Sequence, residues 1–199
     1  MKSDRKSQII QTAAKLFREH GYNSVSMRDL ADKLGIKAAS LYNHIKSKEE
    51  ILAEIIMDLA FDFTKHIDAV EQKEISIIDK LKEIIQMHVQ TTIYKTDSLA
   101  CMNKEWKHLG EEKQEIFLEL RGKYEAKFLQ MIKRGIEKGE LDMKNAEITV
   151  FSILSTLRTL YHWYSNQSVI KEQELINTLQ HNLLFGIVAV ETAHKINLK

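Results

Sequence analysis

Residues 26–52 hold the pattern that decides the fold, SMRDLADKLGIKAASLYNHIKSKEEIL. Ser26 opens a short helix through a Ser-x-x-Asp capping box, and Gly35 ends that helix because glycine adopts the left-handed backbone of a tight turn without steric cost. A second short helix is predicted from Lys37 to about Ile45. Two short helices joined by such a turn form a helix-turn-helix, whose second helix enters the major groove of DNA.

Apolar residues recur every three or four positions on both sides of this stretch, which predicts an all-helical (all-α) fold. Proline is absent and period-2 alternation is rare, so strands are not expected. A first helix is predicted over about residues 5–20, and a fourth begins at a second capping box formed by Ser47 and Glu50. Further helices are predicted over about residues 76–94, 98–108, 112–138, 146–166 and 171–195.

The composition excludes several classes of protein. The chain has 199 residues, 44% of them hydrophobic, enough for one domain or for two small ones that share a core. Cys101 is the single cysteine, which excludes an intrachain disulfide and a four-cysteine zinc site and fits a reducing compartment. The N-terminus lacks the apolar segment of a secretory signal, and the longest apolar run, residues 183–190, is too short to cross a membrane. We therefore expect a soluble cytoplasmic protein with no membrane partner.

The near-neutral net charge of +1 hides an uneven distribution. Residues 1–48 contain 10 Lys or Arg and 4 Asp or Glu, a net charge of +6, which leaves 19 and 24, a net charge of −5, for residues 49–199. The basic segment coincides with the helix-turn-helix pattern, as expected for a surface that contacts DNA phosphates. The alternative is that this charge is only a solvated face.

The outward face of the second short helix carries residues suited to DNA. Asn43 can pair with an adenine, Lys37 can reach a guanine or a phosphate, and the small Ala38 allows close approach to base edges. Lys48 lies in the first turn of the fourth helix, where backbone N–H groups and the positive helix end favour an anion. Ser40, Tyr42 and His44 complete this outward set.

The stretch from about Ile9 to Leu52 resembles the DNA-binding domain of the tetracycline-repressor (TetR) family of bacterial regulators. The resemblance implies an all-helical homodimer with an N-terminal three-helix helix-turn-helix domain, residues 1–48, and a larger C-terminal helical ligand-binding and dimerisation domain, residues 49–199. The fourth helix, from residue 48 to about 69, links the two. The resemblance is carried by Gly21-Tyr22, Gly35, Leu41-Tyr42, His44 and Ser47-Lys48.

The resemblance also assigns roles to single residues. Tyr42 and Lys48 are expected to contact phosphates, and Ser26 and Arg28 are counted among the DNA-binding residues. For His44, a structural hydrogen bond inside the domain and a DNA contact remain equally open. The residues expected nearest the bases are Lys37, Ala38, Ser40 and Asn43.

Two positions depart from the family pattern. Lys37 stands where a Ser or Thr cap is usual, which leaves the capping of the recognition helix open, and Ile45 stands where Phe is usual, a mild change in the core. Ser26 and Ser47 would cap helices in any protein, and Tyr42 has the alternative role of a semi-buried packing residue.

A small-molecule cavity is implied between the helices of residues 76–138. The candidate residues combine apolar bulk with a few donors, as a largely apolar ligand with a polar or anionic end requires, although residues of these types are often only core. Arg121 to Leu141, with Trp163-Tyr164, resembles family members that respond to acyl-coenzyme A, so a fatty or aromatic acyl-CoA is the expected effector. The candidates are His88, Met102, Trp106, Arg121, Tyr124, Phe128, Arg158, His162 and Trp163.

The last two predicted helices carry dense apolar stripes. Two such helices from each subunit would form a four-helix interface, as the family does, or the stripes belong only to the intrachain core. A twofold pair of recognition helices reads half-sites ~34–36 Å apart, so we expect a homodimer on a palindromic operator of double-stranded DNA, acting as a repressor released by its effector. The stripes are Ile148, Phe151, Ile153, Leu154, Leu157, Leu160 and Tyr161 on one helix, and Leu175, Ile176, Leu179, Leu183, Leu184, Ile187 and Val190 on the other.

One enzyme remains as an alternative, a ferritin-like di-iron carboxylate oxidase. Glu105-x-x-His108 and Glu191-x-x-His194 have the spacing that such helical bundles use for iron. Against this hypothesis, short Glu/His patterns arise often by chance, and it leaves the first 48 residues unexplained. Because the phosphate-loop, nucleophile-elbow and zinc-protease motifs are absent, we expect no enzyme, no metal and no cofactor. The further carboxylates available to a di-iron site are Glu74, Glu83, Glu125 and Glu137.

Overall fold

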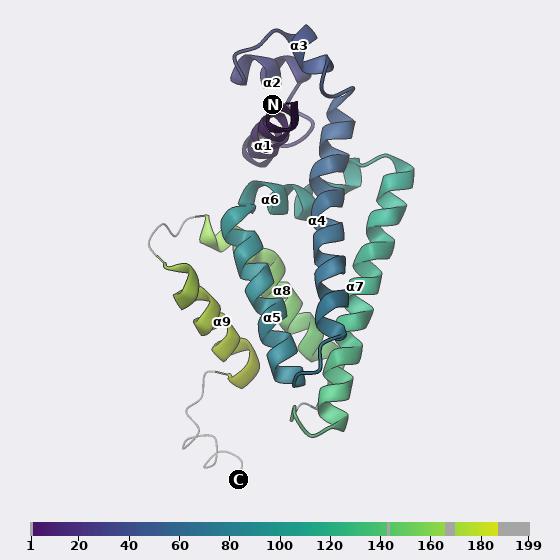
Figure 1. Cartoon of the computed structure of the whole chain (residues 1–199), viewed down its shortest axis with the longest axis vertical. Coiled ribbons are helices and arrows are strands. Elements are labelled where there is room, and N and C mark those ends of the chain that lie inside the picture. The colour runs from purple at the N-terminus through teal and green to yellow at the C-terminus, as the bar shows by residue number, and fades with distance from the viewer. Residues whose placement is uncertain (1, 143, 166–169, 187–199) are drawn as a thin grey trace.

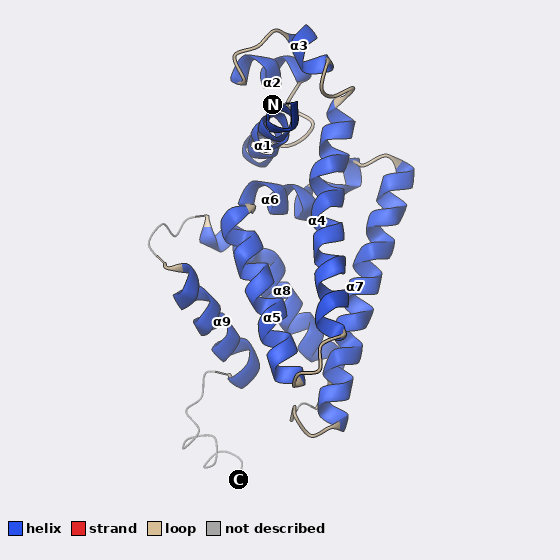
Figure 2. Cartoon of the chain, viewed as in Figure 1, coloured by secondary structure: helices blue, strands red, loops and turns tan. Residues whose placement is uncertain are grey.

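The computed structural model describes residues 2–142, 144–165 and 170–186, and every regular element in these ranges is a helix (Figure 2). The all-helical prediction is therefore confirmed. In chain order the helices are α1 (Lys2–His20), α2 (Met27–Lys33), α3 (Ala38–Tyr42), α4 (Lys48–Glu71), α5 (Ile77–Tyr94), α6 (Thr96–Lys104), the 3₁₀ helix η1 (Trp106–His108), α7 (Glu111–Glu137), α8 (Ala146–Tyr164) and α9 (Glu172–Phe185).

The helices form two groups joined by α4 (Figure 1). The group at one end consists of α1, α2 and α3, which we call the head; α5 to α9 with η1 form the body. Helix α4 runs from the head along the body beside α7, and α9 lies on the outer side of α5. None of the described helices is both long and apolar enough to cross a membrane.

The head folds around the apolar stripe of α1. Ile9 and Phe17 are completely buried, and Leu30 of α2 and Leu41 of α3 pack into the same cluster. Ile45, which replaces the usual Phe, is buried there too, so the smaller side chain is accommodated within the core. The same cluster continues into α4, α6 and α7, so the core of the head is completed by the body.

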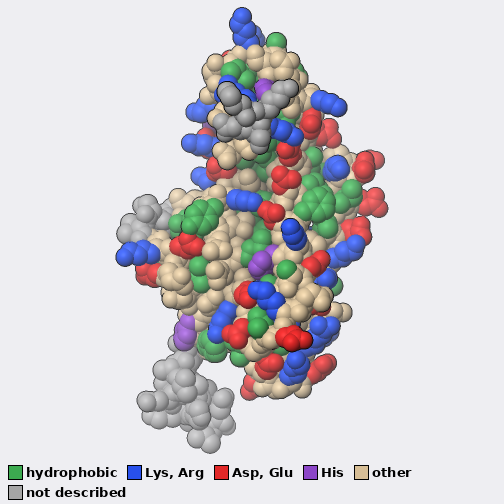
Figure 3. Space-filling view, viewed as in Figure 1, with side chains coloured by type: hydrophobic (Ala, Val, Ile, Leu, Met, Phe, Trp, Pro, Cys, Tyr) green, Lys and Arg blue, Asp and Glu red, His purple; other side chains and the backbone are tan. Residues whose placement is uncertain are grey.

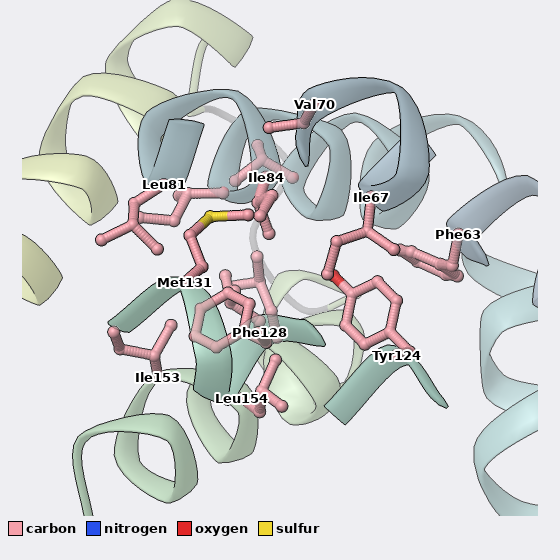
Figure 4. Close-up of a cluster of buried hydrophobic side chains, with 14 of the residues drawn as sticks. Phe63, Ile67, Val70, Leu81, Ile84, Tyr124, Phe128, Met131, Ile153 and Leu154 are labelled. Carbon is pink, nitrogen blue, oxygen red and sulfur yellow. The ribbon is translucent and has the colours of Figure 1, made fainter. Parts of the chain in front are cut away.

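A second cluster fills the body (Figure 4). Phe63 and Ile67 of α4 meet Ile84 of α5, Phe128 of α7 and Leu154 of α8. Each of these helices therefore contributes one apolar face, which is the reason for the three- and four-residue spacing seen in the sequence.

The predicted capping boxes explain where helices begin. The Ser26 hydroxyl accepts a hydrogen bond from the backbone of Asp29 at 3.2 Å, and the Asp29 carboxylate accepts one from the backbone of Ser26 at 2.8 Å. At α4, the Ser47 hydroxyl accepts from the backbone of Glu50 at 3.0 Å, but the Glu50 carboxylate accepts from the backbone of Lys46 at 2.7 Å rather than from that of Ser47, so only half of the predicted box forms. Lys37 at the start of α3 makes no side-chain cap, so the recognition helix begins without one.

Three helix ends differ from the sequence-based boundaries. Helix α3 ends at Tyr42 rather than near Ile45, and the predicted helix over 98–108 is divided, because after Lys104 the chain tightens into η1 before turning into α7. Helix α9 ends before Gly186, which has a positive φ of 79°. The predicted continuation to residue 195, with Ile187 and Val190, lies outside the described residues.

Gly122 and Gly135 both lie within α7, so replacing either with alanine gives the same gain in helix propensity. A difference in stability between the two variants therefore reports how closely each position is packed. A Cβ at Gly135 would stand 2.6 Å from Leu141 Cδ1 and 2.9 Å from Ile77 Cγ2, whereas one at Gly122 meets nothing within 4 Å. Gly122→Ala should stabilise the fold by about 0.5–1 kcal/mol. Gly135→Ala should be less stable than Gly122→Ala by about 1–3 kcal/mol because two side chains must move. Denaturant unfolding measures both, and equal stabilities would contradict the close packing.

Candidate nucleic-acid interface and effector cavity

The predicted DNA-binding residues lie on one end of the head. On α3 and its flanks, Lys37, Ser40 and Asn43 are exposed, and the Tyr42 side chain is 53% exposed, while Ala38 is half-buried. Leu41 points inward, so the packing of α3 turns its polar side outward. Lys and Arg side chains are visible around this end of the molecule (Figure 3).

The start of α2 contributes less than α3 to such a face. Arg28 is exposed, and the exposed Ser26 has its hydroxyl engaged in the capping box, donating to Asp29 at 2.6 Å. His44 is half-buried just after α3, a position compatible with either of the roles left open for it.

Lys48 is held in place at the start of α4. Its Nζ donates a hydrogen bond to the backbone carbonyl of Tyr22 at 2.9 Å and lies 4.2 Å from the centre of the Tyr22 ring. A cation over an aromatic face is attracted by the ring quadrupole, so the ammonium is positioned by the loop after α1. Lys48 therefore links the N-terminus of α4 to the rest of the head.

The ring of Tyr22 also joins the head to the body. It stacks on His108 of η1 with 5.2 Å between ring centres and an angle of 23° between the ring planes. Nearby, Arg18 of α1 forms an ion pair with Asp97 of α6 at 2.7 Å. Between the same two helices, Cys101 Sγ donates to the carbonyl of Ala14 at 3.5 Å, and burial raises the pKa of this thiol to about 12. Helices α1 and α6 thus meet along a closed seam.

Those residues proposed for iron that the structure describes do not assemble into a metal site. His108 Nε2 lies 3.5 Å from the carboxylate of its own neighbour Glu105, and across the described ranges no three His, Cys, Asp or Glu side chains converge to hold a metal ion. The second pair, Glu191 and His194, lies outside the described residues.

A cavity of about 60 Å³ lies between α4, α5, α6, α7 and α8. Among the residues predicted for an effector site, its lining includes His88, Met102, Arg121, Tyr124 and Arg158. Sequence reasoning missed the other lining residues, whose apolar or small side chains at helical spacing gave no signal that distinguishes them from core. These are Ala60, Phe63, Thr64, Leu99, Asn103, Phe117 and Leu120.

Four residues predicted for the effector site lie outside this lining. Phe128 is completely buried in the body core, and Trp106 packs against Phe117 with 5.9 Å between ring centres. His162 and Trp163 are exposed near the end of α8. Helical periodicity places such residues on a helix, but it does not say which neighbouring helix they face.

The inner wall of the cavity is polar but uncharged. His88 Nε2 and the Tyr124 hydroxyl are 2.9 Å apart, and Phe63 lies against the His88 ring at 4.6 Å between centres. Burial lowers the pKa of His88 to about 3, with the charge of Arg158 acting in the same direction. Burial also raises the pKa of Tyr124, so both groups stay neutral near pH 7.

The outer wall of the cavity carries two arginines that share one carboxylate. Arg158 Nη2 lies 2.6 Å and Arg121 Nε 3.2 Å from the same oxygen, Oε1 of Glu125. Partial burial raises the pKa of Glu125, but the hydrogen bond and charge of Arg158, followed by those of Arg121, outweigh it, and the pKa is lowered. The carboxylate is therefore ionised near neutral pH.

Comparison with known proteins decides the family. Residues 9–55 match the family model described as bacterial regulatory proteins, tetR family, and residues 74–187 match the model described as tetracyclin repressor-like, C-terminal domain. The chain belongs to the TetR family. The resemblance seen in the sequence is thereby confirmed, and the TetR chain is a DNA-binding transcriptional regulator rather than the di-iron oxidase of the alternative hypothesis.

Named relatives and solved structures agree with this assignment. The repressor KstR2 of Mycolicibacterium smegmatis is 26% identical over 138 residues, which cover 69% of this chain and 67% of the relative. The TetR family regulator PfmR from Thermus thermophilus is 26% identical, with a TM-score of 0.80 over 91% of this chain and 99% of that one. AibR, solved in complex with isovaleryl coenzyme A and operator DNA, is 20% identical, with a TM-score of 0.76 over 92% and 100%.

His88 predicts a pH dependence of stability. The pKa of His88 is about 3 in the fold and returns to about 6.5 on unfolding, so below pH 6.5 the unfolded chain binds a proton that the folded chain does not. As the pH falls below 6.5, this residue should cost up to about 1.4 kcal/mol of unfolding free energy per pH unit. His88→Gln should therefore flatten the dependence of unfolding free energy on pH.

His66→Gln is the matched control for this measurement. Burial lowers the pKa of His66 as well, but its side chain is only half-buried, so a smaller change in slope is expected. Denaturant unfolding between pH 7.5 and 5 compares the three proteins. Parallel curves for wild type and His88→Gln would show that His88 does not stay neutral in the fold.

Proposed function

We propose that this TetR regulator acts in the cytoplasm as a homodimeric repressor, which binds a palindromic operator through α3 and is released by a small effector. The observation that carries the proposal is the outward polar face of α3 on a head whose core is shared with the body. Repression is supported by the relatives from Mycolicibacterium and Rhodococcus, which are named as transcriptional repressors.

Exposed apolar side chains support a dimer. In the stripe of α8, Ile153 and Leu157 are buried within the chain, whereas Ile148 and Phe151 on the same helix are 63% and 71% exposed. Large apolar side chains left in water favour burial against a partner, and a second copy offers the same surface. Phe185 at the end of α9 is exposed in the same way.

Helix α9 is held on α5, so it does not cover the exposed residues of α8. Gln180 Nε2 donates to the backbone carbonyl of Lys82 at 3.0 Å, and Gln90 Nε2 donates to Glu172 at 3.0 Å. The proposed interface accordingly uses the uncovered face of α8 together with the outer face of α9.

The small cavity supports release through a change of conformation. Ligand pockets usually measure ~300–1,000 Å³, so a cavity of about 60 Å³ must enlarge to admit an effector. Helices α4 and α6 line the cavity and also contact the head, so enlargement shifts the groups that position α3. An effector that binds the enlarged state more tightly thereby weakens operator binding. The ligand of AibR makes an acyl-CoA thioester the first effector to test.

Two variants separate base contacts from phosphate contacts. On an operator selected from random DNA, Lys48→Ala should weaken binding to all sequences alike and lower the slope of log affinity against log salt by about 0.9, because one phosphate contact is lost. Asn43→Ala should cost about 1–3 kcal/mol on the selected operator and leave the salt slope unchanged. Fluorescence anisotropy at several salt concentrations measures both. An unchanged slope would remove Lys48 from the phosphate contacts, and an equal loss on random DNA would remove Asn43 from the base contacts.

Two exposed phenylalanines test the dimer interface. Phe151→Glu places a charge on the proposed interface of α8 and should convert the dimer to monomers, with operator affinity reduced more than tenfold, because only one half-site is then held at a time. Phe61→Glu introduces the same change on α4, where the side chain is 53% exposed, and should leave the dimer intact. Sedimentation analysis reports the mass of each variant. A Phe151→Glu protein that stays dimeric at micromolar concentration would place the interface elsewhere.

A further inference from the structure

The outer wall of the cavity contains more positive than negative charge. Arg121 of α7 and Arg158 of α8 both line the cavity, and both bond to the single carboxylate oxygen Oε1 of Glu125. One guanidinium is therefore left without a carboxylate of its own in this cluster. Among the described residues, the lining itself contains no Asp, Glu or Lys.

This wall has the chemistry of an anion site. A guanidinium presents several N–H donors in one plane and matches the paired oxygens of a carboxylate or phosphate. Glu125 occupies both arginines through one oxygen, while its side chain remains 41% exposed and Arg158 is only 27% exposed. Arg158 both lines the cavity and is mostly buried, so less water competes for its charge than at the surface.

The rest of the cavity selects against other polar groups. The inner pair of His88 and Tyr124 is neutral, and the walls are mostly apolar, including Phe63, Leu99 and Phe117. A cationic ligand would face two arginines without a carboxylate in the lining. An uncharged ligand would leave the Arg121–Glu125–Arg158 cluster as it is.

We propose that the effector is an amphipathic anion whose carboxylate or phosphate replaces Glu125 on Arg158 and Arg121, while its apolar chain fills the enlarged cavity. This inference rests on the proposed function, because an effector is defined by the release of operator. Glu125 then acts as an internal competitor that ties α7 to α8 in the absence of effector. Replacing it breaks the Glu125–Arg158 bond, and the ligand anion then links Arg121 of α7 to Arg158 of α8 in its place.

The test uses four probes with the same eight-carbon chain. Octanoate and octyl phosphate carry the anion at the chain end, octanol carries no charge, and octanoyl-CoA carries its phosphates far from the acyl end. Binding to the full-length protein is measured by calorimetry, and operator release by anisotropy. We expect octanoate or octyl phosphate to bind at least tenfold more tightly than octanol. If octanoyl-CoA binds most tightly and its binding depends on Arg121 and Arg158, the anion that these arginines bind is a phosphate of the nucleotide.

Three variants assign the effect to the cluster. Glu125→Gln should tighten binding of the anionic probes about five- to tenfold, because the competitor loses its charge, and Arg158→Gln should weaken it at least tenfold. Glu119→Gln is the matched control, since Glu119 lies on the same helix and forms a surface ion pair with Lys123 at 2.5 Å. It should change nothing, and octanol should bind all variants alike.

The outcomes separate this inference from the function on which it rests. Tighter binding to Glu125→Gln cannot arise from misfolding, so it supports the proposal even if Arg158→Gln is unstable. The proposal is overturned if neither substitution changes the affinity of the anionic probes. It is also overturned if these probes bind neither wild type nor Glu125→Gln up to their solubility limit. If operator binding persists in that case, only the effector class is wrong. If the wild-type protein binds no operator, the proposed function fails as well.

Discussion

The structure depends on one helix that belongs to two hydrophobic cores. Helix α4 has 24 residues, a length of about 36 Å at 1.5 Å per residue. Its first turns bury Ile51 and Leu52 in the core that includes the head, and its later turns bury Phe63 and Ile67 in the core of the body. Because interiors are packed almost as densely as organic crystals, neither core can shift without moving this helix. The cavity is lined by Ala60 of the first core and Phe63 of the second, so it lies beside α4 where the two cores meet.

A second connection prevents the head from swinging freely on α4. The ion pair of Arg18 and Asp97 and the stack of Tyr22 on His108 fasten α1 to α6 and η1. Helix α6 in turn contributes Leu99, Met102 and Asn103 to the cavity, and so it touches both the head and the cavity. Two contacts constrain the orientation of the head more than one contact does.

The fold could be predicted because its signals are local. The capping box at Ser26, the Ser47 cap of α4 and the turn at Gly35 involve residues three or four apart, and the structure contains all three. The lining of the cavity could be predicted only in part, because it depends on which helices meet. Phe128 was expected there and belongs to the core, whereas Phe117, on the same helix, was missed and lines the cavity. The contact between Glu125 and Arg158 was missed for the same reason, since Arg158 comes from α8, 33 positions along the chain. DNA contacts and the dimer interface remain predictions, because each involves a second molecule.

The position of Cys101 allows its chemical labelling to report the separation of α1 from α6. The thiol is completely buried where α1 meets α6, and its raised pKa leaves almost no thiolate to react with an alkylating reagent while the seam is closed. Labelling then requires α1 and α6 to separate, and the labelling rate measures how often they separate. The rate of alkylation of Cys101, the single cysteine, therefore measures how often the head separates from the body, and no engineered probe is needed.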